Sequence, residues 1–409
     1  MIGTFGAAAL AGITAAVSVF VTILIPIFAF YAGTRIMGAQ AIGAGDLPRF
    51  GRIVRASAVV PFAVALVAIV LALLFARPLI AAMLGHAAIS SVAGGYLVLR
   101  CFALLPIVVS EVAISAFSAA GDTRLALRVL IVINLIHIPL VIVLALGLLT
   151  HHPLGLIGAG ISTLTSEVVG ALYCVAQMRR RRDLHIFAER SIDLRLARAA
   201  AVLGWPEFVF LILMVVPEPL TVVLLAPLGV TTVAAFRALT IVSDFTWAIP
   251  GSLGQAAQIV VGQRLGARDV AGAQAFAGDS IRYATIVCAV VAAIVAVLAR
   301  PLAQLFTLSA TLAAIAAAPL AAHMISLPLK GLSMTAIAPI RAAGDTRFSL
   351  WMGIVTGALS MAGLWLLISV LGFGLWAIPL AWGLAWAVRS ALTLARFRSG
   401  TWRHRELAA

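Results

Sequence analysis

The stretch "SAAGDTRLAL" (residues 118–127) returns as "RAAGDTRFSL" (residues 341–350), so the six letters AAGDTR recur 223 positions apart. The same offset relates "QAIGAGD" (40–46) to "QRLGARD" (263–269), and the Arg-Pro-Leu tripeptide at 77–79 to the one at 300–302. Further along, "GLIGAGIS" (155–162) pairs with "GLWAIPLA" (374–381) at an offset of 219. A nearly constant offset over such a length indicates a tandem duplication of one structural unit.

Composition places both copies in a membrane. Of the 409 residues, 63% are hydrophobic and only 10% are charged, whereas an ordinary globular domain has about 25% charged residues. Apolar runs recur that are long enough to cross a hydrocarbon core of about 30 Å as helices. They lack the short alternating pattern of a membrane β-barrel, so we predict an all-α polytopic membrane protein. The eleven predicted spans are 8–34, 55–76, 89–117, 125–149, 155–177, 199–224, 231–256, 276–299, 311–339, 348–370 and 374–396.

The basic residues are distributed unevenly along the chain. The net charge is +14, with 27 arginines and a single lysine, Lys330. If connections alternate between two sides, 23 arginines fall on one side and only Arg77 and Arg300 on the other. This asymmetry follows the positive-inside rule, so the charge indicates topology and lipid contact rather than a nucleic-acid partner. We expect a monomer in the inner (cytoplasmic) membrane, with the C-terminus in the cytoplasm and the N-terminus outside.

The repeat divides the chain into three parts. We predict an N-terminal bundle of five spans at 1–178, a basic cytoplasmic linker at 179–198, and a C-terminal bundle of six spans with a basic tail at 199–409. One further helix upstream of Met1 would make the halves equal, with six spans each. The fold expected is therefore two repeated six-helix bundles, the first present as five helices, related by a pseudo-twofold axis along the membrane normal.

The repeated hexapeptide is interpreted as a structural turn. In each copy, we expect glycine to end one helix, Asp or Thr to cap the next, and arginine to lie at the lipid headgroups. The alternative is a role in rocking or in cytoplasmic closure. The residues of these turns are Gly121, Asp122, Arg124, Gly344, Asp345 and Arg347. A second pair of structural turns, "GAGD" (43–46) and "GARD" (266–269), contains Gly43, Asp46, Gly266 and Asp269.

Signals of enzymatic chemistry are missing from the sequence. It contains no Walker phosphate loop, and its three cysteines fall inside apolar spans without metal-type spacing. No nucleophile and base occur in a recognisable arrangement. We therefore expect no enzyme activity, no bound metal and no cofactor.

The order of these features resembles the multidrug and toxic compound extrusion (MATE) family, part of a superfamily of multidrug, oligosaccharidyl-lipid and polysaccharide transporters. The resemblance is carried by the "GAGD" turn (43–46), "LRCFALLP" (99–106), the two AAGDTR turns, and "GWPEF" (204–208) followed by "LAPLGV" (225–230). It covers essentially the whole chain. The opening "MIGTFGAAALAG" resembles the family's sequence just after its first helix.

The resemblance implies a secondary exporter in which two bundles rock and exchange amphiphilic, often cationic, drug-like compounds for H⁺ or Na⁺. The alternative, within the same superfamily, is a flippase for lipid-linked oligosaccharides or peptidoglycan precursors. Family members bind the coupling ion with acids in the first, seventh and tenth helices. Here the first position has no counterpart, the seventh falls on Met214, and the tenth falls near Lys330 or Gly331.

Other acids within the predicted spans are the candidates for binding the coupling ion or the substrate in place of the family's acids. Glu218 lies one turn beyond Met214 and between two prolines, where a kinked helix frees carbonyls for a small cation; the alternative is a simple ion pair with Arg237. Asp244, with Trp247 three residues on, suits an organic cation, or else forms a buried polar contact.

Two further acids and three bases complete the candidates. Glu167 and Glu111 are each either functional or part of polar helix packing. Arg100, Arg237 and Lys330 are the basic candidates, and they either neutralise the acids or bind anionic groups.

Overall fold

The computed structural model describes residues 6–84, 87–148, 153–189, 191–307 and 309–404. Within these residues, eleven helical stretches are long and apolar enough to cross a membrane. They correspond one to one with the eleven predicted spans, and the predicted all-α class is confirmed. The chain divides into two compact units, Met1–Phe208 and Val209–Ala409.

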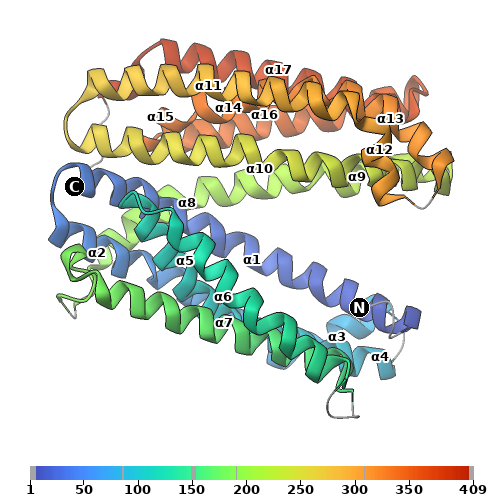
Figure 1. Ribbon diagram of the computed structural model, residues 1–409, viewed down its shortest axis with the longest axis horizontal. Helices are drawn as coiled ribbons and strands as arrows, with labels where there is room; N and C mark the ends of the chain where they lie inside the picture. The colour runs from blue at the N-terminus through green and yellow to red at the C-terminus, as the bar shows by residue number, and fades with distance from the viewer. Residues whose placement is uncertain (1–5, 85–86, 149–152, 190, 308, 405–409) are drawn as a thin grey trace. The chain divides into compact units, whose positions relative to one another are not determined.

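The first unit is built around α1 (Gly6–Gly43), which packs against several later helices of the unit (Figure 1). Its other helices are α2 (Leu47–Ser57), α3 (Val59–Leu84), α4 (Ala87–Phe102), α5 (Leu104–Ala119), α6 (Arg124–Leu140), the π-helical turn η2 (Val141–Ala145), α7 (Gly155–Arg180), the short turn η3 (Arg182–Leu184) and most of α8 (Leu194–Val215).

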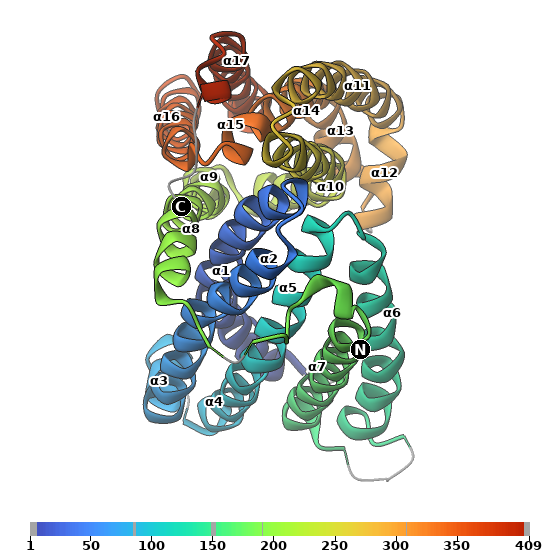
Figure 2. The ribbon, with the colours of Figure 1, turned by 90° about the vertical axis from the view of Figure 1, so that its left-hand side faces the viewer.

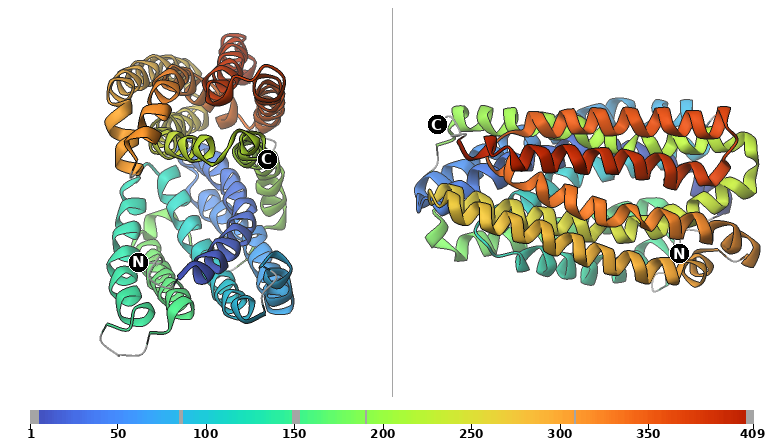
Figure 3. Two further views of the ribbon diagram at one scale, coloured as in Figure 1. Left: turned by 90° about the vertical axis from the view of Figure 1, so that its right-hand side faces the viewer. Right: turned by 90° about the horizontal axis from the view of Figure 1, so that it is seen from above.

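The second unit takes the end of α8 and repeats the pattern. Figure 2 shows its helices end-on, and Figure 3 shows its long helices side by side along their length. They are α9 (Pro217–Leu225), η4 (Ala226–Leu228), α10 (Val230–Gly266), α11 (Val270–Val297), α12 (Ala299–Phe306), α13 (Ala310–Met324), α14 (Ser326–Ala336), α15 (Ala338–Ala342), α16 (Thr346–Trp365), the π-helical turn η5 (Leu366–Val370), η6 (Gly374–Trp376), α17 (Ala377–Arg398) and η7 (Thr401–His404).

The division between the units falls inside α8, ten residues beyond the start of the predicted C-terminal bundle. The beginning of α8 packs tightly on α1: a Cβ on Gly33 would lie 2.7 Å from the backbone of Ala200, and one on Gly204 would meet Phe30 at 2.8 Å. Because these contacts join α8 to the first unit, the helix serves as the covalent link between the two. The boundaries at 178 and 198 describe the sequence repeat and stay predictions.

Small residues form much of the helix contact surface in the second unit. Its largest buried cluster contains many alanines, among them Ala292, Ala313, Ala316, Ala377 and Ala381. In lipid, apolar side chains gain little by leaving one apolar surface for another, so close backbone approach through small residues supplies the packing energy. Many large apolar side chains of this unit are exposed on its outside, which is what a lipid-facing surface requires.

Candidate functional site

Helix α14 lies at the centre of the second unit, packed against α10, α11 and α17. Two glycines bring these helices together. A Cβ on Gly254 of α10 would lie 2.7 Å from the Met334 carbonyl oxygen of α14, and one on Gly331 would lie 2.7 Å from Cys288 Sγ of α11. Distances under about 3 Å leave no room for a side chain, so only glycine fits at either position. The backbone of α14 is therefore held in place at Gly331, the residue directly after Lys330.

Lys330 is the main polar feature of the second unit's interior. Its side chain is 5% exposed, and its Nζ lies 3.2 Å from Nε2 of His323, which is fully buried at the end of α13. Two positive charges at this separation would repel by about 5 kcal/mol at an effective dielectric constant of 20. The pair therefore carries one charge at most, with the ammonium donating to a neutral imidazole.

Aromatic rings surround this pair. Lys330 Nζ lies 5.9 Å from the ring centroid of Trp247 on α10 and 5.9 Å from that of Trp386 on α17. The two indoles are 5.5 Å apart, and Trp382 meets His323 edge to face at 5.4 Å. A cation within about 6 Å of an aromatic face is attracted by the ring quadrupole, so the shell favours a positive charge at Lys330.

A second buried cation, Arg389, lies on α17. Its side chain is fully buried, its Nε donates to Ser333 Oγ at 3.2 Å, and its Cζ lies 5.3 Å from the Trp386 centroid and 4.9 Å from that of Phe210. The residue lies well inside α17, and its planar guanidinium bridges α17 to α14.

Asp244 is an exposed residue on α10, in contrast to the buried cations. Arg237 and Lys330 are the cations that act on it electrostatically. Asp244 and Trp247 are three residues apart on one helix, so their side chains share a face. Among the residues that the structure describes, no carboxylate oxygen comes within the 4.0 Å ion-pair distance of Lys330.

Glu218 lies in the first turn of α9, immediately after a one-residue interruption of the helix at Val216. Its carboxylate pairs with Arg237 at 2.5 Å, and both side chains are more than a third exposed. The ion pair that the sequence left open is therefore the arrangement found. Met214, one turn earlier, is half-buried near the end of α8.

The first unit holds a separate group of charged residues in its spans. Glu111 on α5 and Glu167 on α7 are half-buried and act on each other electrostatically, with Arg35 the opposing charge for Glu111 and Arg100 for Glu167. Arg100 on α4 lies 4.0 Å above the ring of Phe20 on α1. This group balances acids with bases, whereas the interior of the second unit is cationic.

The turns repeat in detail between the two units. Asp46 caps α2 by accepting from Arg49 N at 2.9 Å, and Asp269 caps α11 by accepting from Gly272 N at 2.8 Å. Gly43 and Gly266 end the preceding helices. The cap uses a carboxylate because it satisfies an amide that the first helical turn leaves without a partner.

The AAGDTR turns share a backbone and differ in side-chain contacts. Gly121 and Gly344 have φ of 88° and 82°, values in the left-handed region that glycine adopts most easily. Asp122 accepts from Arg124 N at 3.1 Å, whereas Asp345 pairs with Arg396 at 2.9 Å. Arg124 and Arg347 are exposed in the first turns of α6 and α16.

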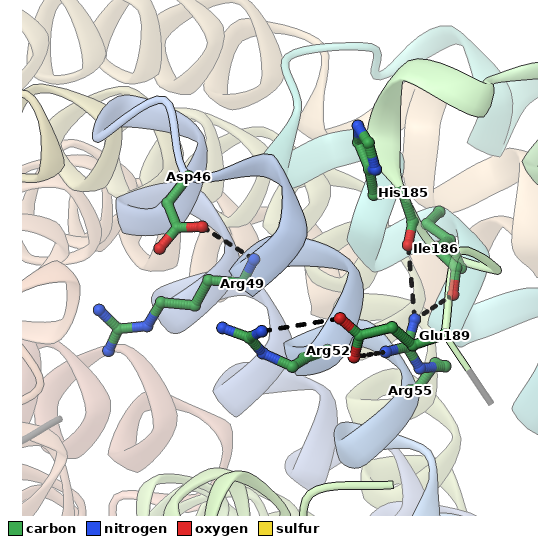
Figure 4. Close-up of polar contacts among 7 residues, drawn as sticks. All are labelled: Asp46, Arg49, Arg52, Arg55, His185, Ile186 and Glu189. Atoms are coloured by element: carbon green, nitrogen blue, oxygen red, sulfur yellow. Dashed lines mark hydrogen bonds and ion pairs between the residues drawn. The ribbon is translucent and has the colours of Figure 1, made fainter. Parts of the chain in front are cut away.

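The linker between the repeats is fastened to α2 (Figure 4). Arg55 Nη1 donates to the Ile186 carbonyl at 2.7 Å and to the His185 carbonyl at 3.4 Å, and its Nη2 pairs with Glu189 at 3.3 Å. Arg52 adds a longer ion pair to Glu189, at 3.8 Å. Gly51 allows the linker to approach, since a Cβ there would overlap the His185 carbonyl. We refer to this set of contacts as the linker clamp.

A tight ion pair precedes the clamp in the linker. Arg181 donates three hydrogen bonds to Asp183, between 2.8 and 3.1 Å. These bonds lower the pKa of the Asp183 carboxyl, because they favour its charged form.

The described residues contain no group of three or more His, Cys, Asp or Glu side chains placed to hold a metal ion. The three cysteines, Cys101, Cys174 and Cys288, are free and buried.

The sequence reasoning missed His323 and Arg389. Helical spacing could have found both. His323 precedes Lys330 by seven residues, and "WGLAWAVR" (382–389) places two tryptophans and the arginine at positions i, i+4 and i+7. Such spacings put side chains on one helix face. The spacing does not predict how α17 is rotated about its axis. In the structure, that rotation turns the face with the two tryptophans and Arg389 toward α14.

The chain is similar in sequence to known proteins. The sequence model of the MatE family matches residues 1–143 and 206–366, more than half of the chain. A Pasteurella multocida protein described as probable multidrug resistance protein NorM is 34% identical over 139 residues, which is 32% of this chain and 29% of that protein. A protein of the same description from Rhizobium meliloti is 27% identical over 285 residues, covering 66% of this chain and 59% of that protein. The matched regions thus span less than two thirds of these relatives' own lengths.

The fold also matches solved structures. A MATE transporter mutant from Vibrio cholerae superposes with a TM-score of 0.88 at 20% identity, covering 98% of this chain and 92% of that one. At this level of identity the likeness establishes the fold.

Proposed function

This chain belongs to the MatE family, and on that premise we propose that it is a secondary active exporter. It antiports amphiphilic, often cationic, compounds against H⁺ or Na⁺ by rocking of its two bundles. The multidrug resistance proteins that it resembles support this proposal. Its partners are the lipid bilayer and small drug-like molecules.

Ionisable side chains inside the spans carry the proposal. Glu111 and Glu167 in the first unit, and Lys330, His323 and Arg389 in the second, all lie within membrane-spanning stretches. Each such group costs roughly 2.5–3.5 kcal/mol on insertion scales, so ionisable residues in spans mark ion or substrate paths. Exchange of a cation for a substrate requires groups of this kind.

Transport in vesicles of the purified full chain tests the proposal. Ethidium, an amphiphilic cation, serves as the probe, and a pH gradient or a sodium gradient is imposed separately. We expect ethidium to move against its own gradient with one of the two, and to stop when that gradient is collapsed. Ethidium movement identical to that of protein-free vesicles under both gradients would overturn the proposal.

A flippase for lipid-linked pyrophosphate compounds is the second candidate. It is favoured by the buried cations Lys330 and Arg389, since basic groups bind pyrophosphate. In the same vesicles, a fluorescent polyprenyl diphosphate would change leaflets for a flippase. We expect no protein-dependent change for the exporter.

The proposed exporter is a monomer in the inner membrane, with its C-terminus in the cytoplasm. The arginine asymmetry supports an inner-membrane protein with a cytoplasmic C-terminus. Because the native cysteines are buried, a cysteine introduced as Ser399→Cys reports alone. It should react with an impermeant thiol reagent only when the cytoplasmic side is accessible.

A further inference from the structure

We propose that Lys330 and His323 together bind the coupling proton, one proton held between two nitrogen bases. This inference rests on the proposed antiport and deepens it, because it names both the coupling ion and the residues that hold it. The resemblance implies acids at three positions, of which the first has no counterpart here, the second falls on Met214 and the third falls near Lys330 or Gly331.

The geometry permits two protonation states with a hydrogen bond in each. When Lys330 is an ammonium, it has only donors, so His323 Nε2 must accept at 3.2 Å and the imidazole proton is on Nδ1. When Lys330 is an amine, its lone pair accepts from Nε2–H. His323 Nδ1 has no hydrogen-bond partner among the described residues, so neither tautomer breaks another contact. The pair switches between charges of +1 and 0.

The surroundings pull these two states in opposite directions. Burial favours the neutral form of Lys330, whereas Asp244 and the Trp247 ring on α10 favour the charged form. On α17, Trp386 also faces the ammonium, and Arg389 lies against the same ring. Helix α11 adds the Cys288 thiol. On α15 the titratable group is Arg341, which lies against Phe210.

The Lys330 ammonium and an organic substrate cation compete for the Trp247 ring, and this competition couples proton release to substrate binding. Trp247 lies 5.9 Å from the Lys330 ammonium and on the same face of α10 as the exposed carboxylate of Asp244. An organic cation that binds Asp244 and stacks on Trp247 occupies the ring and neutralises the carboxylate. Both groups otherwise stabilise the Lys330 ammonium. The ammonium then passes a proton along the hydrogen bond to Nε2 of His323, and the electron pair of the broken N–H bond stays on Nζ. The imidazole releases its Nδ1 proton to water, which leaves the Nε2–H tautomer donating to the lysine amine. Cation and proton therefore exclude each other, as antiport requires.

The single lysine allows a direct measurement. In full-length protein grown with side-chain ¹⁵N-lysine and carrying a lysine-free tag, the only labelled side chain is Lys330. We expect its NMR signal to pass from ammonium to amine across the pH range in which transport operates, and ethidium to move the transition. His323→Gln should change the midpoint, since the two groups titrate as a pair. A signal that stays ammonium throughout, in wild type and variant, would overturn the proposal.

Transport variants separate this proposal from the exporter itself. Lys330→Arg keeps a charge that is never released, and Lys330→Met keeps the approximate size without charge. Both should lose ethidium movement driven by a pH gradient while retaining ethidium exchange at equal pH. Arg282→Met, which removes an exposed charge elsewhere in the second unit, is the matched control and should keep both activities. Gradient-driven movement preserved in Lys330→Arg contradicts the coupling role and leaves the exporter standing. Absence of all ethidium movement in wild type contradicts the exporter, and the lysine signal still decides whether the pair binds a proton.

Discussion

Gly45 and Arg268 occupy the same left-handed backbone position in the two repeats, with φ of 71° and 60°. Each lies just before the aspartate that caps the next helix, and those aspartates also match, with φ and ψ of −88° and 75° at Asp46 and −86° and 70° at Asp269. The amides of the two aspartates donate to the carbonyls of Ala41 and Arg264, at 3.0 and 2.8 Å. The duplicated turn therefore keeps its conformation even where its glycine has been replaced.

This relationship predicts opposite effects from opposite substitutions. A residue with a side chain costs roughly 1–2 kcal/mol in the left-handed region. Gly45→Ala should therefore lower the free energy of unfolding by about 1 kcal/mol, and Arg268→Gly should raise it by a similar amount. Thermal unfolding of the purified protein in detergent measures both.

Arg268→Gly leaves the ion pair between Arg264 and Asp269 in place. Its effect on stability therefore reports the cost of the left-handed backbone conformation at position 268. Equal destabilisation by both substitutions would mean that the side chain of Arg268, and not its conformation, stabilises the turn.

The linker clamp predicts a local opening. Arg55, whose side chain is 13% exposed, holds two linker carbonyls and Glu189. Arg55→Met removes these bonds, and we expect a loss of about 1–2 kcal/mol, or roughly 5- to 30-fold more frequent opening of the linker. Limited trypsin cleavage after Arg179–Arg182 should accelerate accordingly. Arg52→Met removes only a longer, more exposed ion pair, so its cleavage rate should stay near wild type. Equal rates for the two variants would contradict the clamp.

Close approach of α10 and α14 provides a matched glycine pair. Gly254 has no space for a Cβ, because the Met334 carbonyl fills it, whereas Gly251 on the same helix has no atom within 4 Å of that position. Gly254→Val should force the helices apart and disturb Lys330, with destabilisation of about 1–3 kcal/mol. Gly251→Val should be tolerated. Thermal unfolding and the Lys330 NMR signal check both, and a tolerated Gly254→Val would show that α14 is not fixed by this contact.

Arg389→Lys tests whether the buried guanidinium is needed for its shape. Lysine keeps the charge but cannot donate to Ser333 and Thr356 from a planar fork. We expect destabilisation of about 1.5–3 kcal/mol, the range for hydrogen bonds to charged groups. Arg398→Lys, an exposed position at the end of the same helix, should change stability little. If both variants unfold at the wild-type temperature, the α14–α17 bridge contributes no stability.

The spans, the duplication and the family were accessible from sequence because they depend on apolar length and fixed offsets. The repeat placed Asp46 and Asp269 in matching turns, and the structure adds that they cap α2 and α11. The contacts of Lys330 with His323 and Trp386 were not predicted, because these residues lie on α13 and α17, and the rotation of each helix toward α14 is set by tertiary packing. Glu218 shows the same limit. Its bracketing prolines are visible in sequence, but the choice between a free carboxylate and a pair with Arg237 depends on where α9 lies against α10.

Proton counter-movement tests the central claim most directly. Vesicles containing the full chain and a trapped pH indicator, in sodium-free buffer with no imposed pH gradient, are given external ethidium. Proton-coupled exchange predicts that ethidium entry alkalinises the lumen, that Lys330→Met abolishes this change, and that Arg282→Met preserves it. Ethidium entry that exceeds that of protein-free vesicles without any change in luminal pH would contradict the account.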